Sequence, residues 1–464
     1  MTVTDTSTSI PCAPGTLPLL GHAVPLLRDP LGFLRSLPQH GGLVSIRLGP
    51  HPAIVVCDPQ LLHQVLVNDR VFDEGGPLVD RAREFIGNGL IISPHAQHRQ
   101  QRRLVQPAFR PELLPGYART MAVQFHEAIS SWHEGQIINV LDETQQIASR
   151  ALIATLFGAG PDSVSRDRIA ADSATLVAGV YRRAIQPAWL TALPTPANTR
   201  CRRAVRRLRA TIAAYVAEQG PHEDAGPMLS MLLDARDTEG DGQGLSDAEC
   251  IEQVTAFFLA GTETTAVTLA WALHVLAARP DLEHEVRDEA TGMVNGAGVD
   301  PGQLPLTRAV ITEALRLYPP AWLLMRITTT DTALAGHPVP AGTTVVFSPY
   351  LIHHLPDLYP DPERFDPRRW TGAAQHSLPR HGFVPFGGGA CKCIGDQFAL
   401  TESVLALATI VGRWHLEHPD PAAFRTPRPL TTFQPRGLRL RVSSPTALAG
   451  PCTQAPRRKG GDGG

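Results

Sequence analysis

The most informative stretch of this sequence is Phe386-Gly387-Gly388-Gly389-Ala390-Cys391-Lys392-Cys393-Ile394-Gly395. It places cysteine inside a glycine-rich loop. Because glycine has no side chain, the backbone there can approach a ligand closely and can adopt positive φ. Backbone N–H groups that turn toward a cysteine sulfur lower its pKa and tune its electron donation. The loop is therefore suited to hold a thiolate against a large, flat ligand.

Two cysteines of the loop compete for that role. The segment resembles the haem-binding loop of the cytochromes P-450, in which the pattern Phe-x-x-Gly-x-x-x-Cys-x-Gly contains the axial iron ligand. With Cys393 as the ligand, Phe386, Gly389 and Gly395 all occupy the positions of the pattern. With Cys391 as the ligand, the trailing glycine position would hold a cysteine. The resemblance therefore implies haem b with Cys393 as the metal ligand.

The alternative for the same residues is a Cys-x-Cys zinc or disulfide site. A zinc site needs about four ligands at suitable spacing, and the sequence has no second cysteine pair of this kind. Seven cysteines at scattered positions indicate a reducing compartment rather than a disulfide framework.

The predicted elements favour a mainly α fold with a small β portion (α+β). No Ser/Gly-rich linker divides the chain, and the motifs of one haem site span residues 98–395, so the resemblance implies the cytochrome P-450 fold as a single large haem domain. The pattern predicts a β-hairpin over 43–57, mostly helices over 95–295, a helix over 306–318, and strands at 343–347 and 438–442. We expect a Pro-rich segment over 1–30, the haem domain over 31–442 and a disordered tail over 443–464.

The composition excludes some classes of protein. The formal net charge of −2 gives no general attraction to nucleic acid or to an anionic membrane. The N-terminus lacks the charged and apolar regions of a signal peptide or membrane anchor. The apolar run 254–278 is long enough to span a bilayer, but it contains Glu263 and His274, so a buried core helix is the better interpretation. We therefore expect a cytoplasmic protein.

A second motif lies in that apolar run, at Ala260-Gly261-Thr262-Glu263-Thr264-Thr265. Glycine costs a helix about 1 kcal/mol relative to alanine, and a buried acid is costly unless it is paired. The segment resembles the family's oxygen-binding stretch. This implies that Ala260 lies against the cofactor and that Glu263 and Thr264 are the catalytic acid–alcohol pair for proton delivery. The alternative is a kinked structural helix with hydroxyls bonded to carbonyls.

A third motif is Glu313-Ala314-Leu315-Arg316, whose charged residues share one helix face. Most such pairs are solvated and contribute little. The family has this pair joined by an arginine from a Phe-x-Pro-x-Arg-aromatic segment, which here is Phe365-Asp366-Pro367-Arg368-Arg369-Trp370. The resemblance implies a structural network of Glu313, Arg316 and Arg369 behind the haem.

Haem propionates require cations. The family's His-x-x-x-Arg pattern matches His98 and Arg102, and Arg326, ten residues after Arg316, matches another propionate-binding arginine. We expect Arg99 and Arg103 to lie on a solvated helix face, where they and Lys392 could dock an acidic redox partner. The cofactor-binding residues implied by the resemblance are His98, Arg102, Ala260, Arg326, Phe386, Gly389 and Gly395.

The resemblance implies a monooxygenase that hydroxylates an apolar small molecule with O₂ and with electrons from an external ferredoxin and its reductase. The substrate pocket would include the 79–92 loop, Phe257, Ala260, Trp322, Leu323 and Leu324, although core packing is the alternative for about half of these side chains. Stretches at 17–22, 72–77 and 98–109 resemble bacterial sesquiterpene oxygenases of the pentalenene type, which favours a terpene substrate. Rival interpretations are a peroxide-driven or rearranging haem-thiolate enzyme and a non-enzymatic haem-binding sensor.

Cys391 departs from the family, which usually has Arg or His at this position to reach a propionate. We expect Cys391→Arg to restore that contact and to slow the loss of haem to a haem scavenger. An unchanged rate of haem loss would show that the position does not contact the cofactor.

Overall fold

The computed structural model describes residues 9–445, apart from short stretches at 76–78, 80–82, 84–86, 159–161, 187–189, 192, 219–225, 295–299, 372–378, 380, 423, 425–428 and 430–431. Most of the predicted 443–464 tail and the first eight residues of the predicted 1–30 segment lie outside the described residues. That segment carries a short helix, α1, and a bridge between Cys12 and Ser45.

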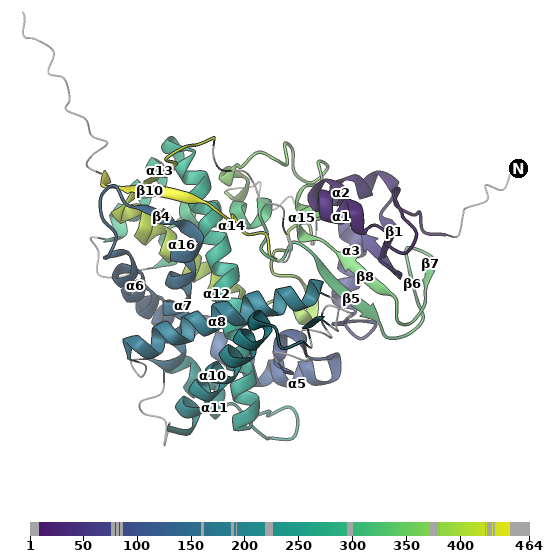
Figure 1. Cartoon of the computed structure of the whole chain (residues 1–464), viewed down its shortest axis with the longest axis horizontal. Helices are drawn as coiled ribbons and strands as arrows, with labels where there is room; N and C mark the ends of the chain where they lie inside the picture. Colours follow the sequence, from purple (N-terminus) through teal and green to yellow (C-terminus); the bar gives the residue numbers. More distant parts are fainter. Residues whose placement is uncertain are drawn as a thin grey trace, which may run out of the picture.

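Helices make up most of the described structure (Figure 1). They are α1 (Ala23–Arg28), α2 (Pro30–Ser36), α3 (Pro59–Val67), α5 (His95–Val105), α6 (Leu114–Ile129), α7 (Val140–Phe157), α8 (Ser163–Ile185), α10 (Pro196–Glu218), α11 (Pro227–Asp234), α12 (Asp247–Ala277), α13 (Pro280–Val294), α14 (Pro305–Leu317), α15 (Pro349–His353) and α16 (Asp396–Arg413).

The strands form three small sheets. A five-stranded sheet has the order β1 (Leu43–Leu48), β2 (His51–Val56), β8 (Thr344–Phe347), β5 (Leu324–Thr328), β3 (Phe72–Asp73). A three-stranded sheet has the order β4 (Ile137–Asn139), β10 (Arg439–Ser443), β9 (His415–Glu417), and β6 (Thr332–Leu334) pairs with β7 (His337–Val339). Strands β2 and β8 are parallel, and the other pairs are antiparallel.

The predicted α+β class is confirmed. The hairpin expected over 43–57 is β1–β2, with Leu48 paired to His51 across a two-residue turn. The helix expected over 306–318 is α14, and the strands expected near 343–347 and 438–442 are β8 and β10.

Helix α12 is the centre of the helical part. Ser246 and Glu249 form a capping box at its N-terminus, which satisfies backbone N–H groups that would otherwise lack partners. By length and composition α12 could cross a membrane, but 78% of its most apolar window is buried inside the protein. Figure 1 shows α7, α8, α10 and α16 gathered around it. The apolar run therefore forms a core helix.

Two clusters of buried apolar side chains fill the interior. The larger one lies among the helices, and the smaller one lies between the five-stranded sheet and helices α2, α3 and α15. Helix α12 contributes to both, because Leu269 and Leu273 belong to the first cluster and Val267 and Trp271 belong to the second. It therefore holds the helical part and the sheet part together.

The predicted charged network lies at the end of α14. Glu313 and Arg316 are both fully buried and are joined by two hydrogen bonds of 2.8 Å. The Arg369 Nε lies 3.5 Å from Glu313 Oε1, and the indole N–H of Trp370 donates to Oε2 at 2.8 Å. The backbone N–H of Asp366 also donates to this carboxylate. Each carboxylate oxygen of Glu313 therefore accepts two hydrogen bonds, which offsets the cost of burying its charge.

Arg316 also reaches backbone carbonyl groups outside α14. Its guanidinium donates to the carbonyl oxygens of His353, Pro362 and Arg364. The Nδ1 of His353 donates to the carbonyl of Arg316 at 3.2 Å, while its Nε2 accepts from the Val384 N–H at 2.8 Å. Burial lowers the pKa of His353 well below its usual value, so the ring is neutral and can fill both roles. The network therefore reaches the residues directly before the cysteine loop.

Removal of either charge should leave its partner buried and uncompensated, which costs about 3–5 kcal/mol. We expect Glu313→Ala and Arg316→Ala to yield little haem-loaded protein, measured as the ratio of Soret to protein absorbance after purification. Arg308→Ala, on the exposed face of the same helix, is the matched control. Normal haem loading in both buried variants would refute the structural role of the pair.

Candidate active site

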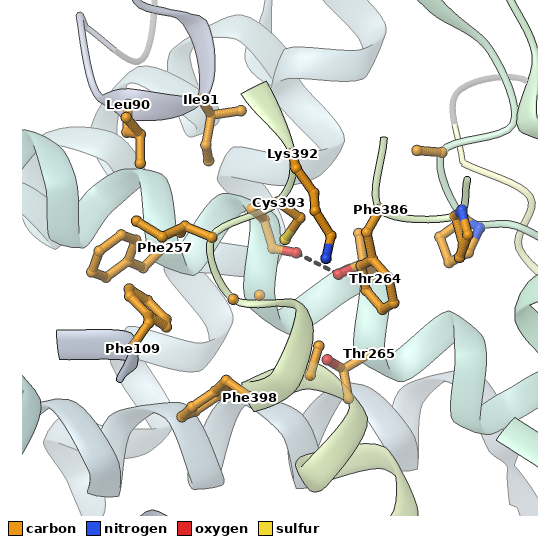
Figure 2. A pocket seen from close by; sticks show the side chains of 18 of the residues that line it. Leu90, Ile91, Phe109, Phe257, Thr264, Thr265, Phe386, Lys392, Cys393 and Phe398 are labelled. Carbon is orange, nitrogen blue, oxygen red and sulfur yellow. Dashed lines mark hydrogen bonds between the residues drawn. The ribbon is translucent and has the colours of Figure 1, made fainter. Parts of the chain in front are cut away.

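A cavity lies between α12 and the cysteine loop (Figure 2). The space between its lining residues is about 1300 Å³, a volume that includes open solvent. Apolar side chains dominate the lining, among them Leu90, Ile91, Phe109, Leu152, Phe257, Ala260, Leu315, Leu324, Phe386, Ile394 and Phe398.

The glycines of the loop fix its path. Gly387 and Gly389 have φ of 69° and 66°, which favour glycine. A Cβ atom on Gly389 would lie 1.8 Å from the Leu66 carbonyl oxygen, so only glycine lets the loop pack against the end of α3. The Cys393 N–H then donates to the Phe386 carbonyl at 2.9 Å. The glycine at position 389 of the motif is therefore required by the packing of the loop in this chain.

Both loop cysteines line the cavity, but they differ in surroundings. The Cys393 side chain is exposed to the cavity and points toward its centre in Figure 2. Without a metal ion, burial raises the pKa of the Cys393 thiol, while a hydrogen bond from the Gly395 N–H and the charges of Arg102 and Lys392 lower it. Coordination of iron would remove the thiol proton outright. Burial raises the pKa of Cys391 to about 12, so this second thiol stays neutral.

Only some residues of the 260–265 motif in α12 face the cavity. Ala260, Gly261, Thr264 and Thr265 line it, and the Thr264 hydroxyl donates to the Ala260 carbonyl at 2.6 Å (Figure 2). A Cβ on Gly261 would make only an ordinary contact with Leu152, at 3.4 Å. Protein packing therefore does not require glycine there, and its small size leaves space on the cavity side.

Glu263 does not line the cavity. Its carboxylate accepts hydrogen bonds of 2.5 Å from Thr432 and from Gln434, in the segment before β10. Neighbouring residues on a helix point about 100° apart, so Glu263 and Thr264 face different surroundings. The predicted acid–alcohol pair is adjacent in sequence but separated in space.

A second buried acid was not anticipated. Glu402 of α16 lines the cavity, is 2% exposed, and accepts a hydrogen bond from Thr265 at 3.1 Å. Its Oε1 is buried without a hydrogen-bond partner in the described structure. Burial raises the pKa of Glu402 to about 8, although the Thr265 hydrogen bond opposes the shift. Its sequence signal was an isolated acid in the apolar run 398–411, nine residues after Cys393.

Two of the three predicted propionate ligands line the cavity, and the third, Arg326, contacts the lining residue Glu74 instead. The two are His98 and Arg102, and Arg102 donates to the Lys392 carbonyl at 2.7 Å. Burial and nearby cations lower the pKa of His98 to about 4, so the ring is neutral. Arg326 is buried and lies 3.2 Å from the Glu74 carboxyl.

Of the two α5 arginines expected on a solvated face, only Arg103 differs from the expectation. Arg103 does not belong to a freely solvated face, because it makes hydrogen bonds of 2.7 and 2.8 Å to Asp237, a residue only 1% exposed. It ties α5 to the segment before α12. Arg99 is about half exposed and lies 3.5 Å from Asp69. Lys392 is half exposed and pairs with Asp396.

The predicted substrate pocket is found in part. Phe257, Ala260 and Leu324 line the cavity, as do Leu90 and Ile91 of the 79–92 loop. Residues 80–82 and 84–86 of that loop lie outside the described residues. Trp322 and Leu323 are absent from the lining and pack in the smaller apolar cluster. Leu324 begins β5, where side chains alternate between faces, so the neighbouring residues could not all point inward.

These residues fit a haem bound through a cysteine thiolate. One side of the cavity offers an accessible sulfur, the opposite helix has small residues, Arg102 lines the cavity, and Arg326 pairs with Glu74 of the lining. Among the described residues, no three His, Cys, Asp or Glu side chains are grouped as a metal site, so a zinc site gains no support. The six cysteines that the structure describes are all free.

Comparison with known proteins gives concordant results. A sequence profile described as "Cytochrome P450" (here cytochrome P-450) matches residues 11–440. The chain is 44% identical to a cyclooctat-9-en-7-ol 5-monooxygenase from Streptomyces melanosporofaciens, over 87% of this chain and 89% of that protein. It is 42% identical to a pentalenene oxygenase from Streptomyces avermitilis, over 94% and 97% of the two chains.

The fold has a counterpart among solved structures. The haem domain of cytochrome P-450DA superposes with a TM-score of 0.83 and 24% identity, over 94% of this chain and 97% of that domain. Enzymes of this kind carry haem with a cysteine thiolate as axial ligand and depend on a redox partner, a substrate and O₂. Profile, relatives and fold agree, and the chain belongs to the cytochrome P-450 family of monooxygenases.

Proposed function

We propose that this protein hydroxylates a terpene hydrocarbon or a terpene alcohol, with Cys393 as the axial ligand of the haem. The observation that carries the proposal is the predominantly apolar cavity that extends from Cys393 to Thr264 and Phe257. An apolar lining orients a substrate by shape, since it offers few hydrogen bonds. The names of the Streptomyces relatives, which describe oxygenation of an alkene and of an unsaturated alcohol, support the same substrate class.

The division of labour follows from the positions of the residues. The haem would supply oxygen activation and C–H hydroxylation when bound, and the protein supplies ligation, proton delivery and the shape of the pocket. Cys393 would hold the iron, and Arg102 and Arg326 would hold the propionates. The Thr264 hydroxyl, anchored on the Ala260 carbonyl, presents a polar atom to the apolar space. Phe257 and Leu324, which line the same cavity, would contact the substrate and orient it relative to the Thr264 hydroxyl.

Protons can reach the site from two acids. Glu263 would deliver protons through water once its carboxylate leaves Thr432 and Gln434. Glu402 would donate directly into the cavity, since its raised pKa keeps it protonated at neutral pH and it lines the cavity beside Thr265. A donor is most effective when its pKa lies near the working pH.

Electrons would come from a ferredoxin and its reductase in the cytoplasm. Arg99 and Lys392 are each about half exposed, and Lys392 directly precedes Cys393 in the cysteine loop. An acidic ferredoxin would find complementary charge there. Arg103 is left out of this surface because two hydrogen bonds hold it to the buried Asp237. Arg99 and Lys392 also pair with acids, Asp69 and Asp396, but keep about half of their side chains exposed.

The substrate class is tested with the purified haem protein. We expect cyclic terpenes to shift the Soret band toward the high-spin form, and a ferredoxin, its reductase, NADPH and O₂ to yield products heavier by one oxygen atom. Fatty acids and macrolides are the comparison ligands. A spin shift with those ligands but not with terpenes would overturn the substrate assignment. Turnover with peroxide but not with ferredoxin would favour the peroxide-driven enzyme.

The role of Glu402 is tested with Glu402→Gln, which keeps the shape and the acceptor for Thr265 but cannot ionise. We expect the share of consumed NADPH that appears as product to fall by on the order of tenfold. This is less than the ~100–10,000-fold that a positioned acid–base group usually contributes, because Glu263 remains as a second proton source. The terpene-induced spin shift should stay unchanged. Glu285→Gln, on the exposed face of α13, is the matched control. Equal coupling in both variants would contradict a role of Glu402 in proton delivery.

A further inference from the structure

The strand pairing brings an acid to the propionate end of the cavity. Strands β3 and β5 are antiparallel, with Phe72 opposite Thr328 and Asp73 opposite Ile327. Continued by one residue, this register places Glu74 opposite Arg326, and the carboxyl lies 3.2 Å from the guanidinium. The Glu74 side chain is 14% exposed and lines the cavity. The strand register thus places Glu74 beside Arg326, the arginine that would bind a haem propionate.

The charges around Glu74 come from several elements. Arg326 on β5 and Arg83 are the cations that act on it, and Asp73 is the neighbouring anion. Its own charge acts in turn on Cys391 of the cysteine loop. Burial outweighs the two cations and raises the pKa of Glu74 to about 7. The carboxyl is therefore largely protonated below neutral pH.

Few other groups at this end can contact a propionate. Neutral His98 can donate one hydrogen bond, and Arg102 is partly engaged by the Lys392 carbonyl. Position 391, where the family usually has a cation, holds a thiol that burial keeps neutral. A second hydrogen-bond donor beside Arg326 would compensate for the missing cation.

We propose that Glu74, as a neutral carboxylic acid, donates a hydrogen bond to one haem propionate and so takes the place of the cation missing at Cys391. The inference rests on the proposed haem site. The acid O–H and the propionate share one proton, and Arg326 neutralises the remaining charge. When Glu74 ionises, it loses the proton that it donates, repels the propionate, and holds Arg326 in an ion pair. Haem is therefore held less tightly as the pH rises through neutrality.

The test follows transfer of haem from the holoenzyme to excess apomyoglobin at pH 6 and pH 8.5. For the natural protein we expect transfer to be faster at pH 8.5 by on the order of tenfold, as expected for one hydrogen bond to a charged group. Glu74→Gln keeps an N–H donor that cannot ionise, so its rate should barely change with pH. Glu112→Gln, on an exposed turn before α6, is the control and should behave like the natural protein.

A double-mutant cycle with Cys391→Arg tests the link between the two positions. If Glu74 replaces the missing cation, the added arginine should reduce the effect of Glu74→Gln, and the two effects will not be additive. Equal pH dependence in the natural protein and in Glu74→Gln would overturn the proposal. Circular dichroism at both pH values shows whether a variant is folded, which separates haem affinity from unfolding.

A negative result for Glu74 can be distinguished from a failure of the proposed haem site. The spectrum of the reduced protein with carbon monoxide reports thiolate ligation independently of Glu74. A strongly red-shifted Soret band with no effect of Glu74→Gln would refute only the role of Glu74. A protein that binds no haem would refute the haem site and the role of Glu74 together.

Discussion

The buried ion pair between Glu313 and Arg316 is the constraint on which the position of the thiolate depends. Neither charge can reach water, so each keeps its ionised form only while the other holds it. Arg316 extends this order through His353 to the Val384 N–H, immediately before the cysteine loop. On the opposite side, the loop rests on α3, where Gly389 meets the Leu66 carbonyl. The reactive sulfur is thus placed by groups that never touch the cavity.

Features carried by one continuous segment could be predicted from the sequence. The central apolar helix depends on local spacing, which the chain displays directly. The ligand role of Cys393 and the buried Glu313–Arg316 pair were implied by motifs that resemble the family's, each of which lies in one short segment. Features that join distant segments could not. The pairing of Arg103 with Asp237 bridges 134 residues, and that of Glu74 with Arg326 depends on the register of β3 against β5. The positions of charged residues along the sequence do not indicate either contact.

The placement of the acids follows the same rule. Glu263 and Thr264 are adjacent in sequence, yet the helix turns them toward different partners, so their cooperation would require water or movement of the carboxylate. Glu402 is remote in sequence but shares a hydrogen bond with Thr265, and it faces the same cavity as Thr264. Distance along the chain is therefore a poor guide to which acid can serve the site. Which acid faces the cavity depends on the direction in which each residue projects from α12 and on the packing of α12 against α16.

The balance of charge at the propionate end explains why neutral groups are favoured there. A haem brings two carboxylates, and Arg102 and Arg326 provide two positive charges near them. An ionised Glu74 would make the buried groups net negative, and an uncompensated buried charge costs several kcal/mol. A protonated Glu74, a neutral His98 and a neutral Cys391 keep the sum over these groups at zero, and the charges of Arg83 and Asp73, which also act on Glu74, cancel each other. This chain has Cys391 where the family usually has a cation. Two arginines therefore balance the two propionates only if Glu74, His98 and Cys391 are neutral.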